Sequence, residues 1–159
     1  MSPSSHSNAQ LIERFYTAFA RGDAATMSAC YAPDATFADP VFTLKGAAIG
    51  QMWHMLAQGA REFSLEFRDI SADDTSGRAH WEARYRFSGT GRKVHNIIDA
   101  EFRLRDGLIV DHRDHFDFWR WSRQALGLPG VLLGWSPLLH NKVRAQAAGR
   151  LAAFAAKQG

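Results

Sequence analysis

The sequence predicts an α+β fold: a curved antiparallel sheet wrapped around three N-terminal helices, with a C-terminal helical extension. Two observations support this prediction. Apolar residues recur at helical spacing up to Leu56, and from Phe63 onward they alternate with polar residues, as in strands with one buried face. Helices that precede antiparallel strands pack on one face of the sheet, and long twisted strands curl. The expected result is a cone-shaped pocket.

Three helices are expected first. The first ends before Gly22, and Asp23 can cap a second, short helix that Pro33 terminates. The third follows Gly46 and ends at Gly59. The apolar stripe of the first helix consists of Leu11, Ile12, Phe15, Tyr16 and Phe19. The apolar face of the third consists of Ile49, Met52, Trp53 and Leu56.

Five strands are expected next. A short one, ATFAD, precedes the third helix, and four longer ones follow it. The longer strands span residues 63–67, 81–87, 94–104 and 108–119, and the turn sequences DDTSG, SGTG and RDG separate them. These elements complete the predicted sheet.

The composition is that of one globular domain, with 159 residues of which 46% are hydrophobic and 22% charged. Residues 1–7 are expected to form a disordered lead-in, 8–120 the main domain, and 121–159 a helical extension packed on that domain. The single cysteine, Cys30, excludes an internal disulfide.

Charge and hydropathy exclude two classes of partner. The net charge of +3 is dispersed rather than gathered in a basic stripe, which does not favour nucleic-acid binding. No apolar run is long enough to span a membrane, and the N-terminus lacks a signal pattern, so a cytoplasmic location is expected. A helix expected over residues 142–159 has basic side chains and no acid. It can pack on the domain, close the pocket, dock on a partner subunit or contact an anionic surface.

Four local sequences resemble one superfamily. IERFYTAFARGD, YAPDATFADP, HNIIDAEFRLRDGLIV and DHRDHFDF occur in this order. They resemble the nuclear-transport-factor-two-like superfamily in its SnoaL-like and ketosteroid-isomerase-like branch, over residues 8–120. The resemblance implies the cone fold and a pocket for a small hydrophobic molecule. It leaves the activity open, because the superfamily includes isomerases, hydrolases, cyclases and proteins without enzymatic activity.

The turn RDGL allows the strand faces to be predicted independently. A two-residue loop at 106–107 would place Glu101 opposite His112 and Asp99 opposite Asp114. Because the other residues of this face in the last strand are apolar, both pairs would lie on the buried side. A bulge at the turn glycine would shift the register and reverse the faces.

The predicted catalytic residues are Asp39, Asp99, Asp114 and His112. The resemblance places Asp39 at the general base, and Asp99 at a protonated acid that donates to the substrate oxygen. Two carboxyl groups that face each other on a buried surface share a proton near neutral pH, and His112 can assist them.

Each of these residues also has a structural interpretation. Asp39 can cap a turn before Pro40, Asp114 can pair with Arg84 or Arg103, and His112 can be a satisfied semi-buried histidine.

The predicted substrate-binding residues are Phe15, Tyr16, Trp53, Arg84, Ile97 and Phe116. The resemblance places Phe15 where isomerases have an oxyanion tyrosine, and Tyr16 lies one residue further on. Ile97 stands where limonene-epoxide-hydrolase-like enzymes have an arginine, for which Arg84 could substitute.

The predicted function is proton transfer on a small hydrophobic carbonyl compound by a cofactor-independent enzyme. Two alternatives stay open: water activation against an epoxide, and a non-catalytic small-molecule-binding or protein-interaction protein. Asp99, His112 and Asp114 could also form a facial metal set, but no short His pair supports it, and no metal is predicted. A homodimer through the outer face of the sheet is expected.

Overall fold

The computed structural model describes residues 3–59 and 61–158. Its elements are α1 (Pro3–Ala20), α2 (Ala24–Ala29), β1 (Tyr31–Ala38), β2 (Thr43–Lys45), α3 (Ala47–Gly59), β3 (Arg61–Ala72), β4 (Ser76–Arg86), β5 (Lys93–Arg105), β6 (Leu108–His115), α4 (Phe118–Leu126), α5 (Leu128–Leu133) and α6 (Pro137–Gln158).

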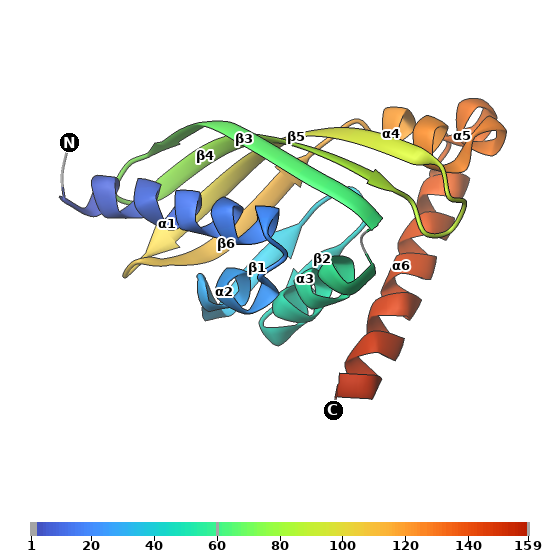
Figure 1. Cartoon of the computed structure of the whole chain (residues 1–159). Helices are drawn as coiled ribbons and strands as arrows, with labels where there is room; N and C mark the ends of the chain where they lie inside the picture. The colour runs from blue at the N-terminus through green and yellow to red at the C-terminus, as the bar shows by residue number, and fades with distance from the viewer. Residues whose placement is uncertain (1–2, 60, 159) are drawn as a thin grey trace.

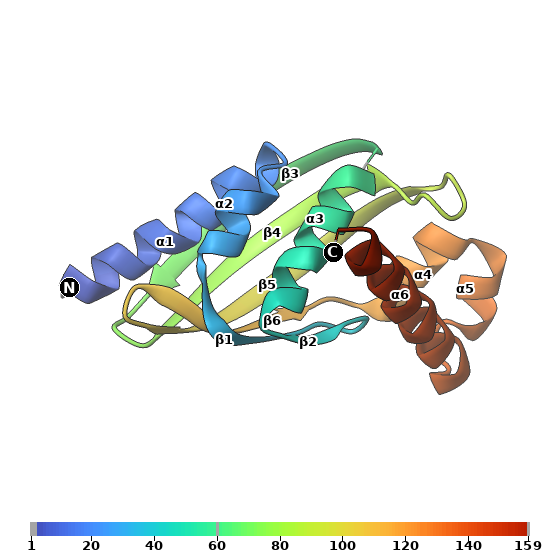
Figure 2. The ribbon, with the colours of Figure 1, turned by 90° about the horizontal axis from the view of Figure 1, so that it is seen from below.

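The strands form one curved sheet in the order β2-β1-β6-β5-β4-β3. Helices α1, α2 and α3 lie on one side of it, and α4 to α6 gather at one end (Figures 1 and 2). The predicted α+β fold is therefore confirmed. The sheet is mixed rather than wholly antiparallel, because β1 pairs in parallel with β6. The sequence prediction also missed β2, a strand of three residues at the sheet edge.

The core forms between the sheet and α1. All five apolar residues of the predicted first-helix stripe are buried, with Phe15 at its centre. Helix α1 begins at Pro3, a residue that is tolerated in the first helical turn because its missing N–H would have no helical partner. Residues 3–7, expected to belong to a disordered lead-in, are part of this helix, and residues 1 and 2 lie outside the described residues.

A β-bulge between β5 and β6 changes the predicted strand faces. The pairs next to the turn are as predicted, but Arg103 pairs with Asp111, so Val110 is an extra residue in β6. Every later pair is shifted by one residue. The shifted pairs are Phe102 with His112, Ala100 with Asp114, and Asp99 with His115. The predicted pairing of Asp99 with Asp114 is therefore wrong.

The chain leaves the sheet earlier than predicted. Strand β6 ends at His115, and the side chain of Asp117 accepts a hydrogen bond from Arg120 N (3.1 Å) as the N-cap of α4. Phe118 and Trp119, predicted to end the last strand, are thus the first residues of a helix. In the described ranges 3–59 and 61–158, no helix is long and apolar enough to cross a membrane.

We expect Gly130→Ala to destabilise the packing of α5 on α4. A Cβ at Gly130 would lie 1.9 Å from the carbonyl oxygen of Ser122, so the backbone has to shift, at a cost of about 1–3 kcal/mol. Urea denaturation measures the change. Gly149→Ala in α6 is the control, because a Cβ there meets no atom within 4 Å and should stabilise the helix by about 0.5–1 kcal/mol. Equal stabilities of the two variants would contradict this packing.

Candidate active site

A cavity of about 1090 Å³ lies between the concave face of the sheet, α3 and α6. Its wall is mostly apolar. Polar residues also line it, among them Asp39, Asn96 and Asp114 and the cations Arg21, Arg86, Arg150 and Lys157. Its aromatic wall includes Phe19, Trp53, Trp81, Tyr85, Phe116 and Trp121. An apolar hollow with a few convergent polar groups is typical of small-molecule sites.

Asp39 lies just after β1 on the cavity wall, before Pro40. Its Oδ1 accepts hydrogen bonds from Val41 N (2.7 Å) and Phe42 N (2.6 Å), so it does cap a turn. Burial raises the pKa of Asp39 to about 6 against the opposing effect of these hydrogen bonds, and the negative charge of Asp114 adds to the rise. Asp39 therefore has a fixed orientation and a pKa close to neutral pH.

His112 and Asp114 belong to a buried chain of hydrogen bonds on β6. The His112 Nε2 lies 2.9 Å from Asp114 Oδ1, and its Nδ1 lies 2.7 Å from the Tyr31 hydroxyl. Trp53 Nε1 donates to the Tyr31 oxygen (3.1 Å), and Trp81 Nε1 donates to Asp114 Oδ1 (3.4 Å). His112 is completely buried, and Asp114 is almost so.

The members of this chain have complementary hydrogen-bonding groups. The two indole N–H groups can only donate, and Asp114 Oδ1 accepts from Trp81 Nε1 and from His112 Nε2 on the cavity wall. The Tyr31 hydroxyl accepts from Trp53 and shares a further hydrogen bond with His112 Nδ1, whose donor depends on the tautomer of the histidine. His112 is thus a satisfied buried histidine, and Asp114 is held by His112 and Trp81 rather than by an arginine.

Three predicted site residues lie on the outer face of the sheet, away from the cavity. The Asp99 side chain is 75% exposed and bonds to His80 Nδ1 (2.9 Å). Arg84 pairs with Glu66 (3.2 Å), and Ile97 is exposed. Asp99 and Ile97 point outward because β5 alternates regularly and the residues between them and beside them, Asn96, Ile98 and Ala100, are buried. Arg84 is outward because its neighbours on β4, Trp81, Ala83 and Tyr85, face the cavity.

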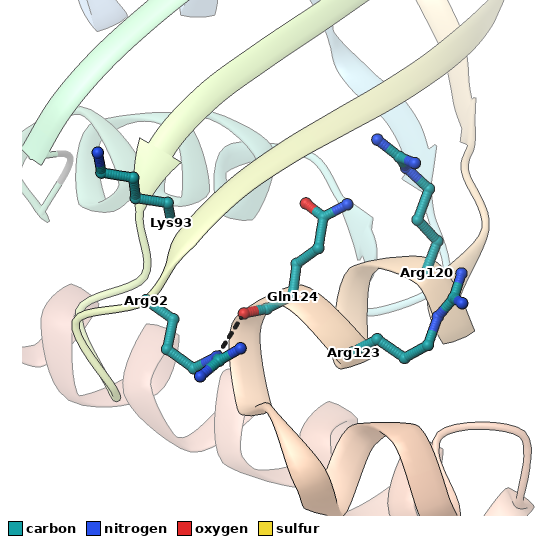
Figure 3. Close-up of a pocket in the computed structure, with 5 residues that line it drawn as sticks. All are labelled: Arg92, Lys93, Arg120, Arg123 and Gln124. Atoms are coloured by element: carbon teal, nitrogen blue, oxygen red, sulfur yellow. Dashed lines mark hydrogen bonds between the residues drawn. The ribbon is translucent and has the colours of Figure 1, made fainter.

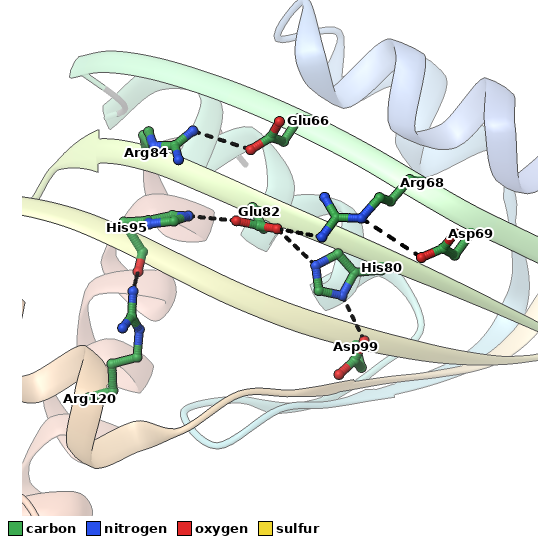
Figure 4. Close-up of polar contacts among 9 residues, drawn as sticks. All are labelled: Glu66, Arg68, Asp69, His80, Glu82, Arg84, His95, Asp99 and Arg120. Carbon is green, nitrogen blue, oxygen red and sulfur yellow. Dashed lines mark hydrogen bonds and ion pairs between the residues drawn. The ribbon is translucent and has the colours of Figure 1, made fainter.

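A polar cluster around Glu82 covers this outer face (Figure 4). Its carboxylate accepts from His80 Nε2 (3.0 Å), His95 Nε2 (2.7 Å) and Arg68 Nη2 (3.0 Å). The hydrogen bonds from the two histidines are the main reason why the pKa of Glu82 is lowered to about 2. The hydrogen bond to Asp99 is the main cause that raises the pKa of His80.

The facial metal set with Asp99 cannot form, because Asp99 is on this face and Asp114 on the other.

Phe15 and Tyr16 are core residues rather than cavity residues. Phe15 is fully buried and packs edge-on against the rings of Tyr31, Trp53 and His112, so it supports the hydrogen-bonded chain from behind. The Tyr16 hydroxyl is buried and has no hydrogen-bond partner among the described residues. Of the predicted substrate-binding residues, Trp53 and Phe116 do line the cavity.

Sequence reasoning missed several cavity residues. Asn96 shares the buried face of β5 with Ile98, and the alternation of that strand could have revealed it. Tyr31 joins the site through the parallel pairing of β1 with β6, for which the sequence has no local signal. Helix α6 supplies Val143 and Phe154 to the wall, so the extension helps to enclose the cavity.

The fold and its enclosed apolar cavity define a cone-shaped protein with the nuclear-transport-factor-two-like fold, as the resemblance implied. Residues 12–112 match the family model of the SnoaL-like domain, and the chain belongs to this family. No curated protein matches the chain by sequence.

Several solved structures are similar. An LEH-like epoxide hydrolase of M. tuberculosis has 21% identity and a TM-score of 0.66, with 82% of this chain and 98% of that one covered. A putative SnoaL-like polyketide cyclase from Jannaschia sp. CCS1 has 15% identity and a TM-score of 0.68, with coverage of 81% and 97%. TsrD from Streptomyces laurentii has 23% identity and a TM-score of 0.67, with coverage of 80% and 99%. At these identities the likeness concerns the fold alone.

Proposed function

We propose that the protein is an enzyme that transfers protons on a small hydrophobic carbonyl compound, with Asp39 as general base. The observation that supports this most directly is a buried carboxyl group on the wall of an apolar cavity, with its pKa raised to about 6. A base with a pKa near the working pH is efficient, and a strongly perturbed group in a hollow is typical of an active site. Asp39 would remove a proton from the carbon next to the carbonyl and return it elsewhere.

Tyr85 is our candidate for the donor to the substrate oxygen. Trp121 Nε1 donates to its hydroxyl oxygen (2.9 Å), which leaves the hydroxyl hydrogen for a ligand in the cavity. Burial raises the pKa of Tyr85, so the hydroxyl stays protonated at neutral pH. In this proposal Tyr85 takes the role that the resemblance assigned to the position of Phe15. His112 holds Asp114 in place (2.9 Å), and the electrostatic effect of Asp114 contributes to the raised pKa of Asp39.

The predicted set for water activation against an epoxide is not assembled, since Asp99 and Arg84 face outward. Proton transfer is therefore the stronger candidate. A non-catalytic binding protein is the alternative, because the same cavity could hold a ligand without reaction. The homodimer through the outer face and the cytoplasmic location stay predictions.

The pH dependence of turnover tests the proposal. On a panel of small hydrophobic ketones and enones, we expect kcat/KM to rise with pH around a midpoint near 6, as Asp39 ionises. Asp99→Asn is the control and should leave both the rate and the midpoint unchanged, because Asp99 lies on the outer face. If kcat/KM did not rise with pH around this midpoint, Asp39 would not be the base. Ligand binding without turnover of any compound would favour the non-catalytic alternative.

A further inference from the structure

Helix α5 and the start of α6 lie at one end of the molecule (Figures 1 and 2), and several of their large apolar side chains are exposed. We call the exposed side chains of residues 128–138 the apolar tip. Leu138 is 78% exposed, Trp135 and Leu128 are each 68% exposed, and Leu132 is 59% exposed. Single exposed apolar residues are normal, but a monomer rarely leaves so many together without a partner.

A basic hollow of about 390 Å³ lies beside the apolar tip (Figure 3). Its wall consists of Arg92, Lys93, Arg120, Arg123 and Gln124, without an acidic residue. Two links connect these features. The Arg123 guanidinium lies over the Trp119 ring, 4.7 Å from its centre, and Trp119 Nε1 donates to Val131 O (3.4 Å) in α5. The Arg92 guanidinium lies beside Gly127, the residue that precedes α5.

The charge of the whole extension is one-sided. Residues 118–159 contain six Lys and Arg residues and no Asp or Glu. They lie entirely outside the family match over residues 12–112. Segments that lie in a membrane interface typically combine exposed Leu and Trp side chains with clustered cations.

We propose that this end of the protein docks on the surface of a bilayer that contains anionic phospholipids. The apolar tip enters the headgroup boundary, and the basic hollow receives lipid phosphate groups. A second copy of the chain fits less well, because two extensions without acids would bring like charges together. The inference does not depend on the reaction in the cavity.

Vesicle co-sedimentation of the full chain tests this proposal. We expect binding to phosphatidylglycerol–phosphatidylcholine vesicles, at least tenfold weaker binding to phosphatidylcholine alone, and weakening as salt is raised. Trp135→Ser/Leu138→Ser and Lys93→Glu/Arg123→Glu should each reduce the binding at least tenfold. Ile97→Ser/Arg103→Glu is the matched control on the outer sheet face and should bind like the wild type. Thermal unfolding of each variant establishes that it is folded.

Three results would overturn the proposal. The first is that the protein does not bind the anionic vesicles. Binding of inorganic phosphate in the basic hollow without vesicle binding would count as this result. The second is an equal loss in the control variant, which would mean that the tip is not the contact. The third is that the wild type self-associates, and that Trp135→Ser/Leu138→Ser abolishes this self-association but leaves vesicle binding intact. This result would mean that the apolar tip binds a second copy of the chain.

Discussion

Asp39→Asn will reduce kcat by a factor of about 10²–10⁴ while ligand binding in the cavity is retained. Asparagine keeps an oxygen that can accept from Val41 N and Phe42 N, so the turn is preserved, but it cannot take up a proton. The measurement is turnover together with ligand affinity by titration calorimetry. Asp99→Asn is again the control. Unchanged turnover in Asp39→Asn would remove Asp39 from the mechanism.

The same variant has an expected effect on stability. The folded pKa of Asp39 is about 6 and its ordinary value is 3.8, so between these values the folded state binds more protons than the unfolded state. Stability therefore falls as pH rises through this window, by about 3 kcal/mol in all. Asp39→Asn lacks this loss and should be the more stable protein at pH 8 but not at pH 3.5. Parallel pH dependences of the two proteins in urea denaturation would contradict the raised pKa.

Phe15→Ala will lower the free energy of unfolding by about 3–5 kcal/mol, the largest stability effect that we expect from one core substitution. The Phe15 ring is fully buried and contacts Tyr31, Trp53 and His112, so its removal leaves a void under the hydrogen-bonded chain. Urea denaturation at pH 7 measures the change.

Ile97→Ala is the control for Phe15→Ala. Its side chain was predicted to bind substrate but is exposed on the outer face, and its truncation should cost less than about 1 kcal/mol. If Phe15→Ala changed ligand affinity but barely altered stability, Phe15 would belong to the cavity wall instead of the core.

The error at Asp99 shows which sequence signal was reliable. The residues of β5 alternate strictly, and Asp99 falls among its polar members while Ile98 and Ala100 are apolar and buried. The alternation alone indicated an outward side chain. The hairpin argument led to the opposite face because it carried a regular register past Val110, where the bulge shifts it. A bulge leaves only a weak signal in the local sequence, so a register that is counted from the turn could not reveal it.

Asp39 and Asp114 both line the cavity, and they were predicted at the site for different reasons. Asp39 follows from the resemblance in YAPDATFADP. Asp114 was assigned to the face of the last strand that was assumed to be apolar and buried. Its assumed partner was wrong, but the bulge precedes Asp114 in β6, and beyond the bulge that face is indeed the buried one. The predicted Asp99–Asp114 pair is replaced by an electrostatic interaction between Asp114 and Asp39, which both line the cavity.

The sequence by itself determined the three N-terminal helices, most of the strands and the family, because helical and alternating periodicities are local properties of neighbouring residues. It also determined that the last strand carries ionisable groups on a buried face. Only the tertiary structure decided which groups meet. The parallel pairing of β1 with β6 brings Tyr31 to His112, the bulge at Val110 turns His112 and Asp114 to the buried face, and α6 adds to the cavity wall. Each of these depends on contacts between residues far apart in the chain, and no local pattern encodes them.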